Sequence, residues 1–396
     1  MKNKLPNYRF SNFLDSWNIG KLSKIANEFQ SGGTPSTKVM NYWNGKIPWL
    51  QSSDLQKDKL FGVELQKFIS EEGLQNSSAK LISKNSIAIV TRVGVGKLAI
   101  IEQNYTTSQD FLSLSNLNGD IFFLVYNLFR MLQKESTQLQ GTSIKGITKE
   151  DLLSKKISLP ESLEEQSAIG SLFRTLDDLL SSYKDNLANY QSLKATMLSK
   201  MFPMAGQTVP EIRLDGFEDG WEEKEFSKLV KRVTQSSDSD SLPKVEFEDI
   251  ISGQGRLNKD ISSKFDNRKG IHFKPGYTLY GKLRPYLNNW LLPKFEGVAL
   301  GDFWVFDPNG NDSNFIYYLV QSSRYQKVAN DTSGTKMPRS DWKSVSSTVF
   351  AIPQTIAEQQ AIGSYFSNLD NLINSHQEKI SQLETLKKKL LQDMFI

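Results

Sequence analysis

The chain carries the stretch PESLEEQSAIGSLFRTLDDLLSSYKDNLANYQSLKATMLSKMF at residues 160–202 and repeats it at residues 353–395 as PQTIAEQQAIGSYFSNLDNLINSHQEKISQLETLKKKLLQDMF. The two copies align without a gap at an offset of 193, and 17 of their 43 positions are identical. Similarity of this extent does not arise by chance, so an internal repeat organises the chain.

Apolar residues in both copies recur at steps of three and four, the pattern of a heptad helix. A helix of about 40 residues is roughly 60 Å long. Its apolar strip needs a partner, so we expect the two copies to pack against each other; packing of each helix on its own domain is the alternative. The predicted seam positions are Ile169, Phe173, Leu176, Leu180, Tyr183, Leu187 and Tyr190, then Ile362, Phe366, Leu369, Ile373, His376, Ile380 and Leu383.

The ends of these helices carry their own signals. Ser162 with Glu165, and Thr355 with Glu358, have the spacing of a capping box, in which hydroxyl and carboxylate each satisfy a free backbone N–H. The run of lysines at 387–389 lies near the end of the second copy, and we expect it to complement a helix C-terminus.

The segments before the helices resemble each other weakly, which makes the chain a tandem of globular domain, long helix, globular domain, long helix. We predict boundaries at 1–156, 157–202, 203–349 and 350–396, with a linker over 203–220 at the start of the third part. The globular parts are predicted to contain both α-helices and β-strands, with many short strands and turns. The expected strands are Lys84–Val90, Lys97–Glu102, His272–Lys282 and Val298–Phe306; the expected helices are Phe123–Gln133 and Phe315–Gln326; Ser236–Ser241 is expected to be a polar loop or a mobile segment.

Composition excludes several kinds of chemistry. The chain has 396 residues, no cysteine and two histidines, so disulfides, thiolate nucleophiles and Cys- or His-rich metal clusters are absent. No metalloprotease, nucleophile-elbow or amino-methylating motif is present, and the chain is expected to be non-catalytic. With no long apolar run, it reads as soluble and cytoplasmic. The net charge is +4, yet residues 1–160 alone carry +7, which permits a phosphate-facing surface there.

Four loops suit contact with DNA phosphates and base edges: three combine glycines, hydroxyls and cations, and the loop at 282–286 has two cations and an aromatic residue. One is the glycine-rich turn at 94–96, whose sequence departs from a nucleotide-binding loop at both ends. For each loop an ordinary connecting turn is the alternative. The candidate DNA-binding residues are Thr91, Arg92 and Lys97 at the first turn; Thr142, Ser143 and Lys145; Lys282, Arg284 and Tyr286; and Thr335, Lys336 and Arg339.

A hydrophobic-x-hydrophobic-Pro pattern, then Glu-Gln, Ala-Ile, a spaced Asp and the long heptad helix, occurs twice, at Ile157–Asp177 and Phe350–Asp370. Gly32-Gly33-Thr34-Pro35 and the Gly-Thr pairs at 141 and 334 accompany it. Over nearly its whole length the chain thus resembles the specificity subunits of type I restriction-modification systems.

The resemblance implies an α+β fold with two mixed α/β target recognition domains, joined by two long antiparallel coiled-coil helices in a pseudo-twofold internal repeat. Each domain would read one half of a split double-stranded DNA site, and the helices would hold the domains apart as a ruler. Two adenine methyltransferase subunits would dock on this frame and restriction subunits would join. S-adenosylmethionine would bind to the methyltransferase subunits, and this chain itself would bind no cofactor and no metal. The helix residues implied in partner binding are Glu165, Gln166, Ile169, Asp177, Glu358, Gln359, Ile362 and Asp370.

Three alternatives stay open at this stage. The chain could be a coiled-coil scaffold whose domains bind proteins rather than DNA, for which binding would be insensitive to salt. It could be a methylase or nuclease that acts alone. It could also be the specificity chain of a related multi-subunit restriction enzyme outside type I.

Overall fold

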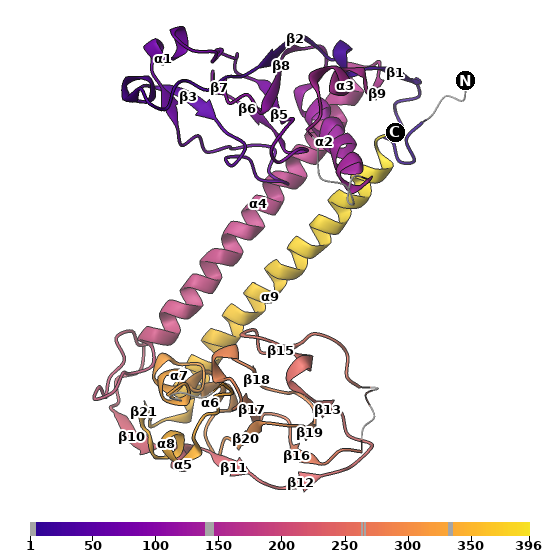
Figure 1. Ribbon diagram of the computed structural model, residues 1–396. Helices are drawn as coiled ribbons and strands as arrows, with labels where there is room; N and C mark the ends of the chain where they lie inside the picture. The colour runs from indigo at the N-terminus through magenta and orange to yellow at the C-terminus, as the bar shows by residue number, and fades with distance from the viewer. Residues whose placement is uncertain (1–4, 139–145, 263, 265–266, 332–335) are drawn as a thin grey trace. The chain divides into compact units, whose positions relative to one another are not determined.

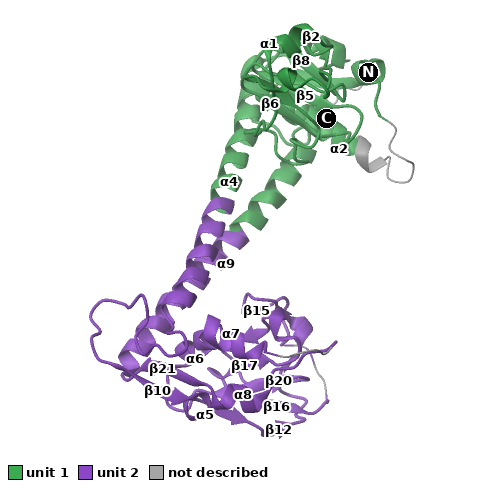
Figure 2. Ribbon diagram, turned by 60° about the vertical axis from the view of Figure 1, so that its left-hand side comes forward, with its two compact units in different colours: residues 1–183, 379–396 green, residues 184–378 purple. Residues whose placement is uncertain are grey.

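The computed structural model describes residues 5–138, 146–262, 264, 267–331 and 336–396 (Figure 1). The chain divides into two compact units, which Figure 2 colours separately. Unit 1 comprises residues 1–183 and 379–396, and unit 2 comprises residues 184–378. Each unit therefore contains one portion of both long helices, α4 (Leu163–Lys200) and α9 (Ile356–Asp393).

Unit 1 is built around a four-stranded antiparallel sheet with the strand order β2-β8-β5-β6. A smaller sheet has the order β4-β3-β7, with β3 and β7 parallel, and a two-stranded ribbon pairs β1 with β9. The bounds are β1 Trp17–Lys21, β2 Ala26–Ser31, β3 Ile47–Leu50, β4 Phe68–Ile69, α1 Glu71–Gln75, β5 Ser86–Val90, β6 Leu98–Ile101, β7 Thr106–Thr107, β8 Phe111–Leu117, α2 Ile121–Gln138, α3 Lys149–Ser154 and β9 Lys156–Pro160.

Strand β5 is buried along its whole length because both of its faces are covered. Ile87 and Ile89 point to the core shared with α2 and the long helices, while Ala88 and Val90 point to a second core under the small sheet. The turn that follows β5 therefore leaves from a strand that is fixed on both sides.

Unit 2 repeats this plan. Its main sheet has the order β11-β20-β17-β18, and its smaller sheet has the order β12-β16-β19-β13, with β13 and β19 parallel. The bounds are β10 Trp221–Glu225, α5 Phe226–Leu229, β11 Lys231–Val233, β12 Ser236–Ser237, β13 Lys244–Val245, β14 Ile250–Ile251, β15 Arg256–Leu257, β16 Gly270–Phe273, β17 Thr278–Gly281, β18 Trp290–Leu291, β19 Gly297–Ala299, β20 Phe303–Asp307, α6 Ser313–Leu319, α7 Ser323–Ala329, α8 Trp342–Ser347 and β21 Val349–Pro353.

Both units close their cores with the Met-Phe pair that ends each sequence repeat. In unit 1 the ring of Phe395 lies 5.3 Å from Phe123 and 5.5 Å from Phe173. In unit 2 the ring of Phe202 lies 5.6 Å from Phe315 and 5.9 Å from Phe366. Each long helix thus begins in one unit, and the Met-Phe pair that follows its end is buried in the core of the other.

The two long helices run antiparallel, as predicted. Within unit 1 Lys387 of α9 pairs with Asp177 of α4. Within unit 2 Lys194 of α4 pairs with Asp370 of α9, and Tyr190 packs edge-on against His376 with ring centroids 5.2 Å apart. Residue numbers rise along α4 as they fall along α9, so the two repeats contact each other as expected. The first seam residues of each helix also pack on their own unit, as Phe173 does against Tyr126 at 5.1 Å, so the alternative holds for that part of the seam.

Three expected elements are divided by turns. The stretch His272–Lys282 forms parts of β16 and β17, separated by a turn in which Gly276 has φ +81°. Val298–Phe306 is divided into β19 and β20 at Gly301, with φ +89°. Phe315–Gln326 forms two helices because Ser322 caps the second through the N–H of Tyr325. Part of Ser236–Ser241 is strand β12 rather than loop.

The capping boxes form only in part. The hydroxyls of Ser162 and Thr355 accept from the N–H of Glu165 and Glu358, at 3.2 and 3.3 Å. The two carboxylates instead turn into their units, and each binds an arginine and a tryptophan. The expectation for Lys387 was also wrong, because its ammonium reaches across to Asp177 rather than to a helix terminus.

Candidate nucleic-acid interface

The first candidate surface lies at the turn between β5 and β6 in unit 1. Thr91 is buried, and its N–H and hydroxyl both donate to the backbone oxygen of Asp110, at 2.7 and 3.0 Å. The N–H of Ile147 donates to the oxygen of Thr91 at 2.7 Å. A Cβ on Gly146 would lie 2.8 Å from that oxygen, so a glycine lets the two segments approach closely. Hydrogen bonds therefore hold the start of the turn to Asp110, which directly precedes β8, on one side and to Ile147 on the other.

The tip of this turn faces solvent. Gly94 and Gly96 have φ +89° and +95°, which permits the tight reversal. Arg92 is exposed and Val93 is 71% exposed. The ammonium of Lys97 donates to the backbone oxygen of Ser52 at 3.2 Å, so it is engaged within the unit.

A cleft of about 1000 Å³ opens beside the tip. Arg92, Gly146 and Lys149 line it, and so does Gly32 of the Gly-Gly-Thr-Pro motif. The predicted residues Thr91 and Arg92 thus share one concave surface with residues far away in sequence.

Unit 2 has the same construction at the turn between β17 and β18. The N–H of Lys282 donates to the backbone oxygen of Asp302 at 2.9 Å, and the N–H of Ser340 donates to the oxygen of Lys282 at 2.9 Å. Lys282, Asp302 and Ser340 therefore take the places of Thr91, Asp110 and Ile147. These shared backbone hydrogen bonds match the loop at 282–286 to the glycine-rich turn of unit 1.

The side chains at this second turn differ from those in unit 1. Arg284 is exposed and adopts a left-handed conformation with φ +49°, which is uncommon for a non-glycine residue. Its N–H donates to the oxygen of Pro338 at 2.7 Å, which fixes that conformation. Tyr286 is 58% exposed at the tip. The structure therefore presents Arg284 and Tyr286 outward from a rigid turn.

Asp302 also organises charge at this turn. Its carboxylate lies 3.0 Å from Nη2 of Arg339 and 3.5 Å from Nζ of Lys282. Burial acts to raise the pKa of Asp302, but the two cations outweigh it and hold that pKa below its ordinary value. Sequence reasoning missed this residue, because only the pairing of β17 with β20 brings it to the turn.

The remaining predicted residues belong to the loops that contain the two Gly-Thr pairs. Thr142, Ser143, Lys145 and Thr335 lie outside the described residues. Lys336 is exposed, two residues before the backbone oxygen that binds the turn. Arg339, which forms a β-bridge with Leu283, joins the surface that holds Lys282 and Arg284.

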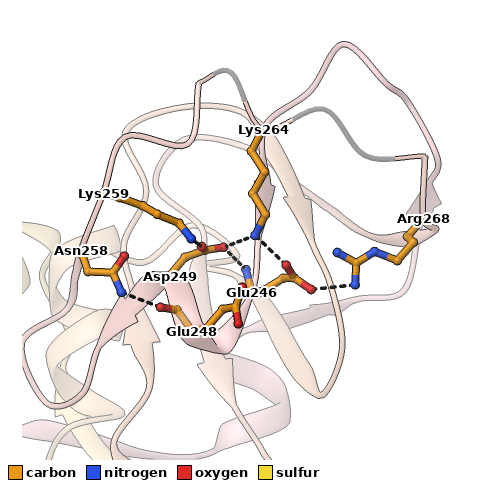
Figure 3. Close-up of polar contacts among 7 residues, drawn as sticks. All are labelled: Glu246, Glu248, Asp249, Asn258, Lys259, Lys264 and Arg268. Atoms are coloured by element: carbon orange, nitrogen blue, oxygen red, sulfur yellow. Dashed lines mark hydrogen bonds and ion pairs between the residues drawn. The ribbon is translucent and has the colours of Figure 1, made fainter.

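A second charged cluster in unit 2 has a different character (Figure 3). Nζ of Lys264 lies between the carboxylates of Glu246 and Asp249, at 2.6 and 2.8 Å, and Lys259 lies 2.9 Å from Asp249. Arg268 pairs with Glu246 at 2.7 Å. Because each cation faces a carboxylate, this cluster suits holding a segment in place rather than binding phosphate.

The pKa values in this cluster follow from the pairing. Burial acts to raise the pKa of Asp249, but Lys264, Lys259 and the N–H of Glu246 together hold it below the ordinary value. Arg268 and Lys264 likewise lower the pKa of Glu246. Burial lowers the pKa of Lys264, and its two carboxylate partners more than offset this, so that pKa is raised.

The helix residues implied in partner binding lie mostly inside their units. Glu165 and Glu358 are 1% and 2% exposed, and each accepts from an arginine and a tryptophan indole, Arg9 with Trp17 and Arg213 with Trp221. Gln166, Gln359, Ile169 and Ile362 are also buried. Asp177 and Asp370 pair with lysines of the opposite helix. Their role toward a partner stays a prediction.

Other apolar residues on the same helices face solvent, and they occur in repeat-related pairs. Each pair is separated by the 193-residue offset of the internal repeat, which gives both units the same three positions. They are Leu163 and Ile356, at 62% and 43% exposure, Leu179 and Leu372, at 42% and 41%, and Leu193 and Leu386, at 36% and 44%.

Two further findings concern what the described ranges lack. They contain no cluster of three or more His, Asp or Glu side chains placed to hold a metal ion. Within the same ranges, no helix has both the length and the apolar character that a membrane span requires.

Comparison with known proteins identifies the family. The model of the type I restriction modification DNA specificity domain matches residues 15–189 and again residues 224–385. The specificity subunit of the type I restriction enzyme MjaIX from Methanocaldococcus jannaschii is 24% identical over 404 positions, which cover 95% of this chain and 91% of that protein.

Two solved structures share the fold. The crystal structure of the S subunit of a type I restriction-modification system from M. genitalium matches with a TM-score of 0.63 and 14% identity, over 99% of both chains. A second structure, described as the structural basis of complex assembly and conformational transition of the type I R-M system, matches with a TM-score of 0.53 and 15% identity, over 96% of this chain and 97% of that one. The chain therefore belongs to the type I restriction-modification DNA specificity family, and it is a DNA-recognition subunit rather than a catalytic one.

Proposed function

We propose that this chain reads a bipartite double-stranded DNA target, one half-site per unit, and positions adenine methyltransferase and restriction subunits on it. The observation that carries the proposal is the shared construction of the two turns. Thr91 and Lys282 occupy the same place in the same backbone hydrogen-bond pattern, yet the side chains around them differ. A constant frame with two different reading surfaces suits an asymmetric target.

The chemistry of each surface supports different half-sites. Unit 1 offers Arg92 and the apolar Val93 beside a cleft, so it combines one cation with a contact for a thymine methyl group. Unit 2 offers Lys282, Arg284 and Arg339, which can donate to guanine edges and to phosphates. Thr142, Ser143, Lys145, Thr335, Lys336 and Tyr286 complete the proposed DNA contacts, whereas Lys97 supports the turn through its bond to the backbone oxygen of Ser52.

The repeated exposed leucines support two copies of one partner. A protein that docks on Leu179 of unit 1 meets the equivalent Leu372 in unit 2, at nearly the same exposure of 42% and 41%. Single exposed leucines are ordinary on a protein surface, so the support comes from their recurrence at the repeat offset, which gives a partner the same contact twice. We infer that each unit binds one methyltransferase subunit.

In this proposal the chemistry resides on the partners. S-adenosylmethionine binds to the methyltransferase subunits, and this chain holds neither cofactor nor metal. The complex works in the cytoplasm, where its DNA target lies. The description of one structural relative as part of a type I R-M complex assembly supports a multi-subunit role.

The test is sequencing of methylated adenines in cells that carry this chain with the methyltransferase subunit of its system, compared with the methyltransferase subunit alone. We expect a bipartite methyladenine motif that appears only with the chain. Co-purification of the two proteins with no new motif would favour the protein-binding scaffold. Cleavage beside the motif by the assembled complex would instead indicate a related system outside type I.

A further inference from the structure

Asp302 lies where two segments of unit 2 meet at the proposed DNA surface. Its Oδ2 accepts from Nη2 and Nε of Arg339 at 3.0 and 3.3 Å, and its Oδ1 lies 3.5 Å from Nζ of Lys282. Its backbone oxygen accepts from the N–H of Lys282 at 2.9 Å. One residue therefore holds two cations that are 57 positions apart in the sequence.

The group remains open to a ligand. The side chains of Asp302, Lys282 and Arg339 are 27%, 30% and 52% exposed. A guanidinium has five N–H donors and an ammonium has three, so the bonds to one carboxylate use only part of their capacity. The remaining donors can reach a base edge or a phosphate while Asp302 fixes their direction.

Unit 1 shows that the backbone frame does not require this charge arrangement. Asp110 occupies the equivalent place, and its backbone oxygen accepts from Thr91. The residues that correspond to Lys282 and Arg339 are Thr91 and Gly146, which carry no charge. The side-chain triad of Asp302 is therefore an addition of unit 2 to a backbone frame that both units share.

We propose that Asp302 is a specificity-determining residue of the second half-site: it orients Lys282 and Arg339 toward base edges and reduces their attraction to DNA phosphates. The inference rests on the proposed function. Phosphate contacts supply affinity without sequence information, whereas oriented donors to bases supply discrimination. A carboxylate among the cations repels a phosphate, so it disfavours non-target DNA.

The first experiment measures binding of the full chain to a random-sequence duplex at several salt concentrations by fluorescence anisotropy. Asp302→Asn removes the charge with little change of shape and frees both cations for phosphate contact. The slope of log K against log salt then steepens by about 0.9 for each new phosphate contact, and affinity at low salt rises several-fold. In a Lys282→Met, Arg339→Gln background, the same substitution leaves the slope unchanged, because the cations it acts through are gone.

The second experiment sequences methylated adenines in cells that carry the methyltransferase subunit with the wild-type chain, D302N, D302E or D110N. D302N relaxes at least one base pair of the second half-site, with discrimination roughly five- to hundredfold lower, and leaves the first half-site intact. D302E keeps the charge and retains most of the discrimination. D110N leaves the second half-site unchanged, and a thermal melt confirms that each variant folds.

The outcomes separate the two proposals. If the wild-type chain gives no motif, the proposed function fails and this inference fails with it. If the wild-type motif appears and D302N leaves both the second half-site and the salt slope unaltered, the inference alone is overturned. Equal relaxation of both half-sites by D302N also overturns it, because Asp302 would then act through general stability.

Discussion

Nζ of Lys194 on α4 lies 2.7 Å from Oδ1 of Asp370 on α9, and Tyr318 donates its hydroxyl proton to the other oxygen of that carboxylate at 2.8 Å. The repeat-related Lys387 and Asp177 make the same group with Tyr126 in unit 1. Each group joins both long helices to a domain helix. A polar group in an otherwise apolar helix seam favours one register over alternatives.

Breaking one member of this group should therefore destabilise unit 2. Lys194→Met leaves the carboxylate of Asp370 without its cation in a mostly buried site, where Lys194 and Asp370 are 12% and 19% exposed. We expect a loss of about 1–3 kcal/mol in the free energy of unfolding, measured by chemical denaturation.

Two variants control this measurement. Lys194→Met with Asp370→Leu and Tyr318→Phe should recover most of the loss, because an apolar group replaces the buried ion pair and leaves no hydroxyl without its acceptor. Lys200→Met breaks the exposed pair with Glu211 and should change stability by less than about 0.5 kcal/mol. Equal losses for Lys194→Met and Lys200→Met would argue against a special role for the seam group.

The sequence predicted these helices well because the heptad pattern depends on local spacing alone. Ile169, Phe173, Leu176 and Leu180 are buried as expected. The ion pairs between the helices were not predicted. Pairing Lys387 with Asp177 requires knowing how α4 and α9 are aligned along each other, which the spacing within either segment does not tell. A signal was nonetheless present: Lys194 falls on the apolar seam, and both members of the pair are identical in the two repeats.

The candidate DNA surfaces were predicted in part for a similar reason. Glycines and cations mark the turns at Thr91 and Lys282 in the sequence itself. Asp110 and Asp302 reach those turns from other strands, so only the strand order β8-β5 and β20-β17 reveals them. Turn chemistry is local and readable, whereas the partners that orient a turn depend on sheet topology.

The cluster around Asp249 should make unit 2 sensitive to acid. The pKa values of Asp249 and Glu246 are lowered by folding from ordinary values of 3.8 and 4.5. A carboxylate whose pKa is lowered by folding stabilises the folded state at pH values above its unfolded-state pKa. This contribution is lost as the pH falls through its folded-state pKa. We expect thermal stability to drop as pH falls below about 4, and Asp249→Asn to reduce that dependence.

A neighbouring carboxylate provides the control for this acid sensitivity. Glu248 is exposed and takes part through its backbone oxygen, which Asn258 contacts. Glu248→Gln should leave the pH dependence of the melting temperature unaltered. An identical pH profile for wild type and Asp249→Asn would exclude the cluster as its source.

The tips of the two turns should act on separate halves of the target. Tyr286→Ala removes an exposed aromatic ring from unit 2, and Val93→Ala removes an exposed apolar side chain from unit 1. We expect each change to relax only one half-site, by about 1–3 kcal/mol per affected base pair, because apolar side chains contact thymine methyl groups in the major groove. Sequencing of methylated adenines reports both halves at once, and relaxation of both by one variant would contradict independent reading.

The exposed leucines make a quantitative prediction about partner number. Leu179→Glu and Leu372→Glu place a charge at repeat-related positions with 42% and 41% exposure. If each unit binds one copy of the same methyltransferase subunit, each substitution should lower the affinity of one of the two binding sites at least tenfold, because it places a charge in an apolar contact. Native mass spectrometry should then count one bound subunit for either variant and none for the double variant. Met40→Glu, at an 84% exposed apolar position outside the repeats, should still bind two. Two bound copies in all four variants would show that these helix faces are not the docking surface.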